Sequence, residues 1–178
     1  SSPYSAEQVT PVDEKQTRFP SPGEYLYEPS GAVVRAHLVQ ELAQELGANL
    51  IDPHLAYLTA AKAVQSPLAQ CYEVLEEIPV HEKQLKKWVR ERGFTALTIK
   101  KRGVDLVPEK MRATLLAGGA GKKSGKKAAK NQGYNPATLV FTRVGFGQQA
   151  RRIGWHVRPV DFSDSAQVSS SDTKNSVV

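Results

Sequence analysis

The basic run Lys100-Lys-Arg-Gly-Val-Asp105 is the strongest candidate for chemistry in this sequence. A guanidinium such as that of Arg102 can hold a phosphate through two parallel hydrogen bonds, which a lysine ammonium cannot do. The run stands where a predicted strand ends, and Gly103 permits a backbone conformation that other residues avoid. Arg112, one turn into the next predicted helix, can join the same patch. We interpret Lys100, Lys101, Arg102 and Arg112 as a phosphate-binding turn; a solvated turn is the alternative.

A second group of cations lies between residues 118 and 133, a stretch with five lysines, five glycines and no acidic residue. Its Gly121-Lys-Lys-Ser124 is close to the end of a phosphate-binding P-loop, but a P-loop needs a preceding strand and a fixed glycine spacing, which are absent here. The composition predicts a flexible basic loop without a packed core. The loop cations predicted to contact phosphates are Lys122, Lys123, Lys126 and Lys127. A tolerated surface insertion remains the alternative.

Charge is distributed very unevenly along the chain, whose net charge is +6. Residues 1–93 carry 9 basic and 13 acidic residues, whereas residues 94–160 carry 14 basic and 2 acidic residues. Such asymmetry indicates that the second half faces a polyanion. Arg143 and Arg151 on the expected final hairpin extend the set of candidate phosphate ligands. A lysine-rich segment that only aids solubility is the competing interpretation.

The sequence shows no recognisable catalytic set. A dinucleotide or S-adenosylmethionine site of the Rossmann type would need a glycine-rich turn after a first strand, and none occurs. The four histidines have no metal-ligand spacing, and the single cysteine, Cys71, suits a small buried hydrophobe in a strand. We therefore predict no catalytic residue, metal or cofactor site in this chain.

Apolar spacing predicts helices at 31–46, 81–92 and 108–118. In the first, Val34, Leu38, Leu42 and Leu46 recur at i+4 spacing and form an apolar stripe. Ser30 is the expected N-cap of the first helix, Gly47 and Gly93 supply left-handed exits, and Pro108 suits a first helical position. Expected strands are 55–58, 70–78, 96–100, 137–144 and 150–157, the last two forming a hairpin around Gly145-Phe-Gly147. Helices interleaved with strands predict a compact α+β fold with a mixed sheet, about three helices and a C-terminal β-hairpin.

Composition also predicts the domain limits. Residues 1–22 suggest a linker or disordered N-terminal segment, 23–160 a single domain containing the flexible loop 118–134, and 161–178 a disordered, serine-rich tail. No apolar run approaches the roughly 20 residues needed to span a bilayer. The absence of a recognisable signal peptide and the lone cysteine favour a cytoplasmic protein with no membrane partner.

Five segments together carry a resemblance to a known family. They are Tyr25-Leu-Tyr-Glu-Pro-Ser-Gly-Ala-Val-Val-Arg-Ala-His-Leu-Val39, Leu50-Ile-Asp-Pro-His-Leu-Ala-Tyr-Leu-Thr59, Cys71-Tyr-Glu-Val-Leu-Glu-Glu-Ile-Pro79, Leu97-Thr-Ile-Lys-Lys-Arg-Gly-Val-Asp105 and Thr138-Leu-Val-Phe-Thr-Arg-Val-Gly145. In this order they resemble the THUMP-like domain at the C-terminus of bacterial, actinobacterial-type class I S-adenosylmethionine-dependent methyltransferases. The family usually has an acidic N-cap residue before Pro108, where this chain has Val107. The lysine-rich loop looks like an insertion into a connection that is short in the family.

The resemblance implies a noncatalytic domain that binds structured RNA and positions it for a catalytic domain absent from this chain, where S-adenosylmethionine would bind. It also implies a contact with the methyltransferase domain through Tyr25, Tyr27, Glu28 and Arg35. The alternative hypothesis is a structural module that stabilises the methyltransferase domain without binding RNA. That alternative predicts an exposed apolar patch around Tyr25, Tyr27 and the first helix.

Overall fold

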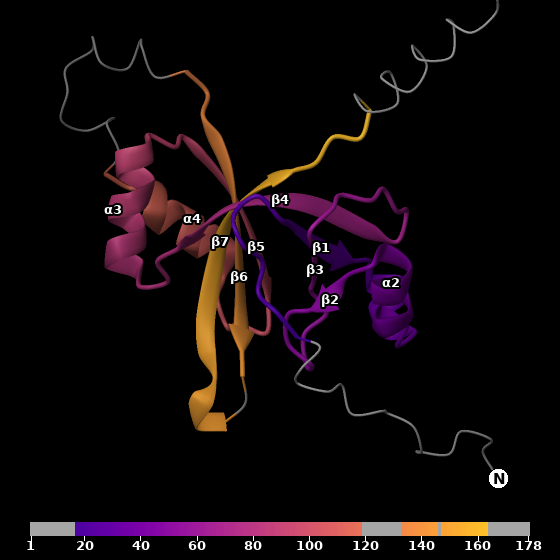
Figure 1. Cartoon of the computed structure of the whole chain (residues 1–178). Helices are drawn as coiled ribbons and strands as arrows, with labels where there is room; N and C mark the ends of the chain where they lie inside the picture. The colour runs from indigo at the N-terminus through magenta and orange to yellow at the C-terminus, as the bar shows by residue number, and fades with distance from the viewer. Residues whose placement is uncertain (1–16, 119–132, 146, 164–178) are drawn as a thin grey trace, which may run out of the picture.

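A computed structural model describes residues 17–118, 133–145 and 147–163 and confirms the α+β prediction (Figure 1). In these residues a mixed seven-stranded sheet is accompanied by four α-helices. The strands are β1 (Tyr25–Pro29), β2 (Asn49–Leu50), β3 (Leu58–Ala60), β4 (Ala69–Ile78), β5 (Ala96–Arg102), β6 (Pro136–Val144) and β7 (Arg151–Pro159). The helices are α1 (Gly31–Arg35), α2 (Val39–Leu46), α3 (Glu82–Arg92) and α4 (Pro108–Leu116).

The sheet has the order β2-β3-β1-β4-β7-β6-β5. Among the named strands of the described residues, β5 and β6 form the only parallel pair, and the chain passes through α4 between them, as a parallel pair requires a crossover. The predicted final hairpin is confirmed, since β6 pairs antiparallel with β7. We did not predict β1, because a strand of five residues that ends in Pro29 has little signal of its own. It is held on both sides by β3 and β4.

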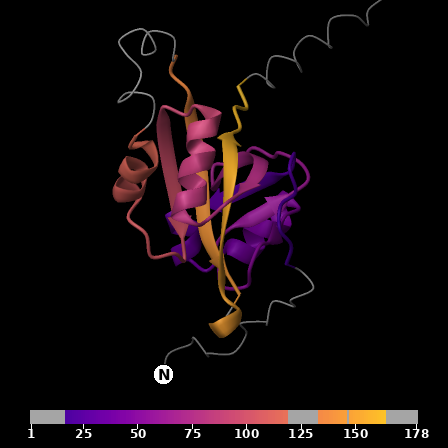
Figure 2. The same ribbon diagram turned by 90° about the vertical axis from the view of Figure 1, so that its left-hand side faces the viewer.

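The sheet curls so that one face becomes convex and the other concave. All the helices lie on the convex face, where α3 and α4 cover β5 to β7 and α2 covers β1 to β4 (Figures 1 and 2). The concave face closes around a core that includes Leu26, Tyr57, Tyr72, Val140 and Trp155. Because the sheet curls, residues of the edge strand β5 meet residues of β1 across this core.

The predicted helix 31–46 is wrong as a single element. It breaks at Ala36–Leu38 into α1 and α2, and His37 adopts a left-handed backbone with φ of 56°. The break rotates the second half, so Leu38, which we expected on the apolar stripe, is 48% exposed. Leu42 and Leu46 are buried as the periodicity predicted.

The predicted helix boundaries are otherwise largely confirmed. The hydroxyl of Ser30 accepts a hydrogen bond from the N–H of Val33 at the start of α1. Gly47 and Gly93 end α2 and α3 in the left-handed conformation. Pro108 begins α4, and the preceding Val107 makes no side-chain cap. Cys71 is buried as predicted, and burial raises the pKa of its thiol to about 11.

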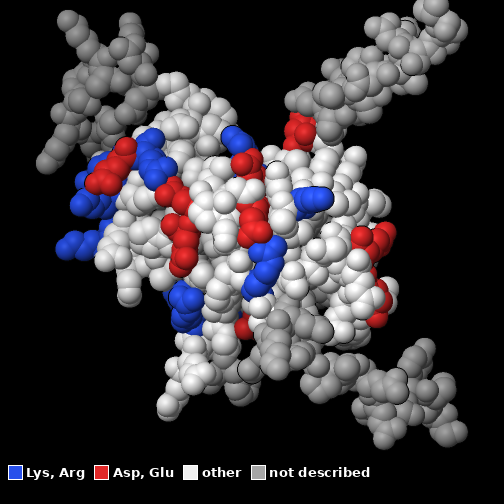
Figure 3. All heavy atoms as spheres, viewed as in Figure 1, with Lys and Arg blue, Asp and Glu red and all other residues white. Residues whose placement is uncertain are grey.

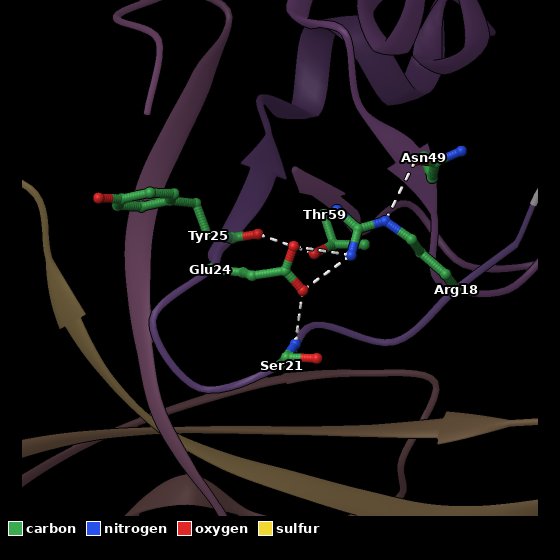
Figure 4. Close-up of polar contacts among 6 residues, drawn as sticks. All are labelled: Arg18, Ser21, Glu24, Tyr25, Asn49 and Thr59. Atoms are coloured by element: carbon green, nitrogen blue, oxygen red, sulfur yellow. Dashed lines mark hydrogen bonds and ion pairs between the residues drawn. The ribbon is translucent and has the colours of Figure 1, made fainter. Parts of the chain in front are cut away.

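Arg18 ties the start of the described chain to the sheet (Figure 4). Its guanidinium donates to both carboxylate oxygens of Glu24, at 2.8 and 2.9 Å, and to the side-chain oxygen of Asn49 at 3.3 Å. The hydrogen bond from Arg18 lowers the pKa of Glu24, assisted by the N–H of Ser21. Residues 17–22 of the predicted linker therefore contact the domain, while residues 1–16 and 164–178 lie outside the described residues.

Candidate nucleic-acid interface

The basic run of β5 is divided between the two faces of the sheet, because successive side chains in a strand point in opposite directions. Lys100 faces the concave side, where its ammonium lies 3.3 Å from Oε1 of Glu28 and 5.7 Å from the ring centroid of Tyr72. Burial opposes the charged form of Lys100, but Tyr72 and Glu28 outweigh it and raise the pKa of the lysine. Lys100 is therefore a half-buried cation with an internal counter-ion.

Arg102 also faces the concave side and has its own internal partners. It donates to the backbone oxygens of Ala56 at 2.7 Å and of Pro29 at 2.9 Å, and its guanidinium lies 5.2 Å from the ring centroid of Tyr57. Burial raises the pKa of Tyr57, so its hydroxyl remains protonated and near Glu28, at 3.4 Å. Arg102 thus joins the end of β5 to two segments far away in the sequence.

Arg112 does not join Lys100 and Arg102 in one exposed patch. Its Nε donates to the backbone oxygen of Leu97 at 2.7 Å, which fixes α4 against the edge strand β5. The arginine is half-buried. Three of the four cations that the sequence grouped in one turn consequently hold the fold together through contacts within the chain.

Lys101, on the convex side, lies instead near exposed arginines of the neighbouring strands. Lys101 is level with Phe141 in the register of β5 and β6, and Arg143 follows two residues later on the same face. Arg143 stands directly opposite Arg152 of β7. We call Lys101, Arg143 and Arg152 the end patch. All three are exposed, and within the described residues no carboxylate forms an ion pair with any of them.

The three cations of the end patch repel one another, and this repulsion destabilises the domain when it is alone. Like charges directly opposite each other on paired strands are destabilising. Arg143 and Arg152 are such a pair, and Lys101 adds a third positive charge nearby. An anionic partner would remove this repulsion. The sequence places Arg152 on the final hairpin together with Arg143, Arg151 and Arg158, but it does not reveal which residues of a hairpin face each other.

The other predicted cations have different positions. Arg151 is exposed on the opposite face of β7 from Arg152, with its guanidinium 5.6 Å from the ring centroid of Phe19. Lys122, Lys123, Lys126 and Lys127 lie outside the described residues. Figure 3 shows a further group of basic side chains over α3, where Lys83, Lys87 and Arg90 are exposed.

The four residues predicted to contact a second domain do not form one exposed surface. Tyr27 is fully buried, and its hydroxyl donates to the backbone oxygen of Lys62 and accepts from the N–H of Val64. Glu28 is paired with Lys100, and Tyr25 is half-buried. Arg35 is exposed at the end of α1. Tyr27 therefore has no exposed surface to offer a second domain.

The described residues show no cluster of three or more histidine, cysteine or carboxylate groups that could hold a metal ion. No helix within these residues is long and apolar enough to cross a membrane. His156 is largely enclosed by Trp88 and Phe94, whose ring centroids lie 5.4 and 5.2 Å from its own. These ring contacts are part of the packing of α3 on the sheet.

The fold and the end patch define an α+β domain with a basic end. Comparison with known families matches residues 69–159 to the THUMP domain-like family. The chain belongs to this family. The match includes β4 to β7 and therefore all three residues of the end patch.

Two curated relatives are described as uncharacterized S-adenosylmethionine-dependent methyltransferases of Mycobacterium tuberculosis strains CDC 1551 / Oshkosh and ATCC 25618 / H37Rv. Each is 29% identical over 137 residues, which is 77% of this chain and 34% of the relative. The crystal structure of a proposed methyltransferase from Porphyromonas gingivalis W83 superimposes with a TM-score of 0.56 at 20% identity, over 83% of this chain and 33% of that one. The chain thus spans about a third of the length of these proteins, and the crystal structure supports the fold alone.

Proposed function

We propose that this chain is the RNA-binding domain of an S-adenosylmethionine-dependent methyltransferase and positions structured RNA for a catalytic domain outside the chain. The relatives are named as methyltransferases, and this chain accounts for about a third of their length. S-adenosylmethionine would bind in the remaining part and supply the methyl group. The residues described here would contribute binding and orientation only.

The observation that carries the proposal is the end patch. Lys101, Arg143 and Arg152 come from three adjacent strands, are exposed, and have no acidic partner among the described residues. Arginine is suited to phosphate because its planar guanidinium can form two parallel hydrogen bonds. The pairing of Arg143 with Arg152 places two guanidinium groups on neighbouring strands, where they would meet consecutive phosphates of a polynucleotide.

The test compares two triple variants with the same change in charge. Lys101→Gln/Arg143→Gln/Arg152→Gln neutralises the end patch, and Lys83→Gln/Lys87→Gln/Arg90→Gln neutralises three exposed cations on α3. Affinity for a pool of structured RNAs is measured by filter binding at fixed salt, and circular dichroism checks folding. We expect the end-patch variant to bind about ten-fold or more weakly, since each lost phosphate contact removes part of the electrostatic binding energy.

The α3 variant controls for the general effect of net charge, and it should bind less than three-fold more weakly than wild type. Equal losses in the two variants would contradict the assignment of the site to the end patch. Failure of the wild-type chain to bind RNA would contradict the proposed function itself. The domain would then support the methyltransferase without touching its substrate.

A further inference from the structure

A groove of about 550 Å³ lies between the α1–α2 turn and the segment that follows β2. Its apolar lining includes Val39, Leu50 and Leu55, and polar groups are supplied by His37, Gln40 and His54. His37 is exposed and holds a left-handed backbone, and Gln40 and His54 are also exposed. The groove therefore combines apolar walls with hydrogen-bonding groups, as sites for small ligands do.

One short segment, residues 51–57, is a wall of the groove and also a neighbour of the end patch. A methyl group added at Gly103 would lie 2.8 Å from Cδ2 of Leu55 and 4.0 Å from Cβ of Arg143. Leu55 and Arg143 therefore flank the same glycine, two residues after Lys101. The groove and the end patch are contiguous around the end of β5.

Hydrogen bonds fix this segment in place. The buried carboxylate of Asp52 accepts the N–H of Gly145 in the β6–β7 turn and the N–H of His54, both at 2.8 Å. Ala56 is held by Arg102 from the end of β5. Asp52 and Arg102 thus keep the groove wall at a constant position relative to the hairpin that carries Arg143 and Arg152.

We infer that the groove receives an unpaired nucleobase of an RNA strand whose phosphates lie on the end patch, so that this domain prefers single-stranded or unpaired RNA to a continuous duplex. The inference rests on the proposed function. A base has apolar faces for the groove walls and a polar edge for His37, Gln40 and His54. The neighbouring Glu41 is an acceptor for an amino group of the base and a poor neighbour for phosphate, so the base and not the backbone suits this groove.

The experiment uses the whole 178-residue chain and a 12-nucleotide RNA with a central 2-aminopurine, either alone or annealed to its complement. Three proteins are compared at one salt concentration: wild type, Gln40→Ala/His54→Ala in the groove, and the end-patch triple variant. Affinity is measured by anisotropy on an end label, and 2-aminopurine emission reports the environment of the base. Enclosure of a base by the apolar walls and the imidazole rings of the groove should give wild type about a five-fold or greater preference for the single strand.

The groove variant is expected to bind both RNAs with similar affinity and to lose the change in 2-aminopurine emission. The end-patch variant is expected to lose affinity for both. Equal binding of the two RNAs by wild type, or an unchanged preference in the groove variant, would overturn the inference and leave RNA binding by the end patch intact. Absence of any binding by wild type would overturn the proposed function together with this inference.

Discussion

At the scale of residues, alternation along one strand decides which cations are structural and which can meet a ligand. Lys100 and Arg102 share the concave face and bind groups of the chain itself, whereas Lys101 between them is exposed on the convex face. The sequence identified all three as basic, but it could not show that the sheet curls enough to bring Glu28 and Pro29 to β5. The division of roles therefore depends on tertiary structure.

This division predicts that the same substitution has a large effect on stability at Arg102 and little effect at the neighbouring Lys101. Arg102→Met removes two hydrogen bonds to backbone oxygens, and hydrogen bonds to charged groups are worth about 1.5–3 kcal/mol each, less when partly exposed. We expect the free energy of unfolding to fall by about 1–3 kcal/mol. Lys101→Met, the matched control, should change it by about 0.5 kcal/mol or less. Urea unfolding of both variants measures this, and equal effects would show that Arg102 has no special structural role.

Because His156 is largely buried, we predict that the stability of the domain depends on pH. Burial lowers the pKa of its imidazole below the ordinary value of 6.5, although Glu76 acts in the opposite direction. The unfolded chain then binds more protons than the folded chain below about pH 6.5, so stability is highest above that pH and falls as the pH drops through it. In His156→Gln this loss between pH 7 and pH 5.5 should be smaller, as measured by urea unfolding at both pH values. An identical pH dependence in wild type and variant would show that His156 does not contribute.

At the scale of elements, the parts that the sequence predicted well are those with strong local signals. The strands predicted at 70–78, 96–100, 137–144 and 150–157, the hairpin, and the glycine exits at 47 and 93 all follow from local chemistry, whereas the strand predicted at 55–58 is wrong, since β3 begins only at Leu58. The break at His37 does not follow from local chemistry, because a left-handed conformation is uncommon for every residue other than glycine and one histidine gives only a weak signal for it. Strand β1 was also missed, since its stability comes from β3 and β4 on either side. The groove, which the break at His37 helps to form, was therefore invisible in the sequence.

The start of α4 gives a prediction at this scale. Val107 occupies the N-cap position, makes no side-chain hydrogen bond to the helix and is 48% exposed. Val107→Asp would accept a hydrogen bond from a free N–H of the first turn and interact favourably with the helix dipole. We expect a gain of about 0.5–1 kcal/mol in the free energy of unfolding. Thermal unfolding of Val107→Asp, with Val107→Ala as the control, measures this gain. If the aspartate variant is no more stable than the alanine variant, α4 does not lack an N-cap that a side chain at position 107 can supply.

At the scale of the whole molecule, curling of the sheet creates both surfaces on which the functional account depends. It brings the segment after β2 to the turn after β5, and this places the groove beside the end patch. The helices cover the convex face but leave the hairpin end exposed (Figures 1 and 2). The sequence predicted a basic second half and a polyanion partner, but the grouping of Lys101 with Arg143 and Arg152 required the register of three strands.

The central claim is that phosphates of RNA bind the end patch, and its most direct test is the salt dependence of binding. The logarithm of the dissociation constant is measured against the logarithm of salt concentration for wild type and for Lys101→Gln/Arg143→Gln/Arg152→Gln. Each phosphate contact contributes about 0.7–0.9 to the slope, so loss of three contacts should reduce it by about 2–3. A reduced slope together with weaker binding is the result we expect. An unchanged slope would contradict the account, because the three cations would then neutralise no phosphate and release no counterions from the RNA.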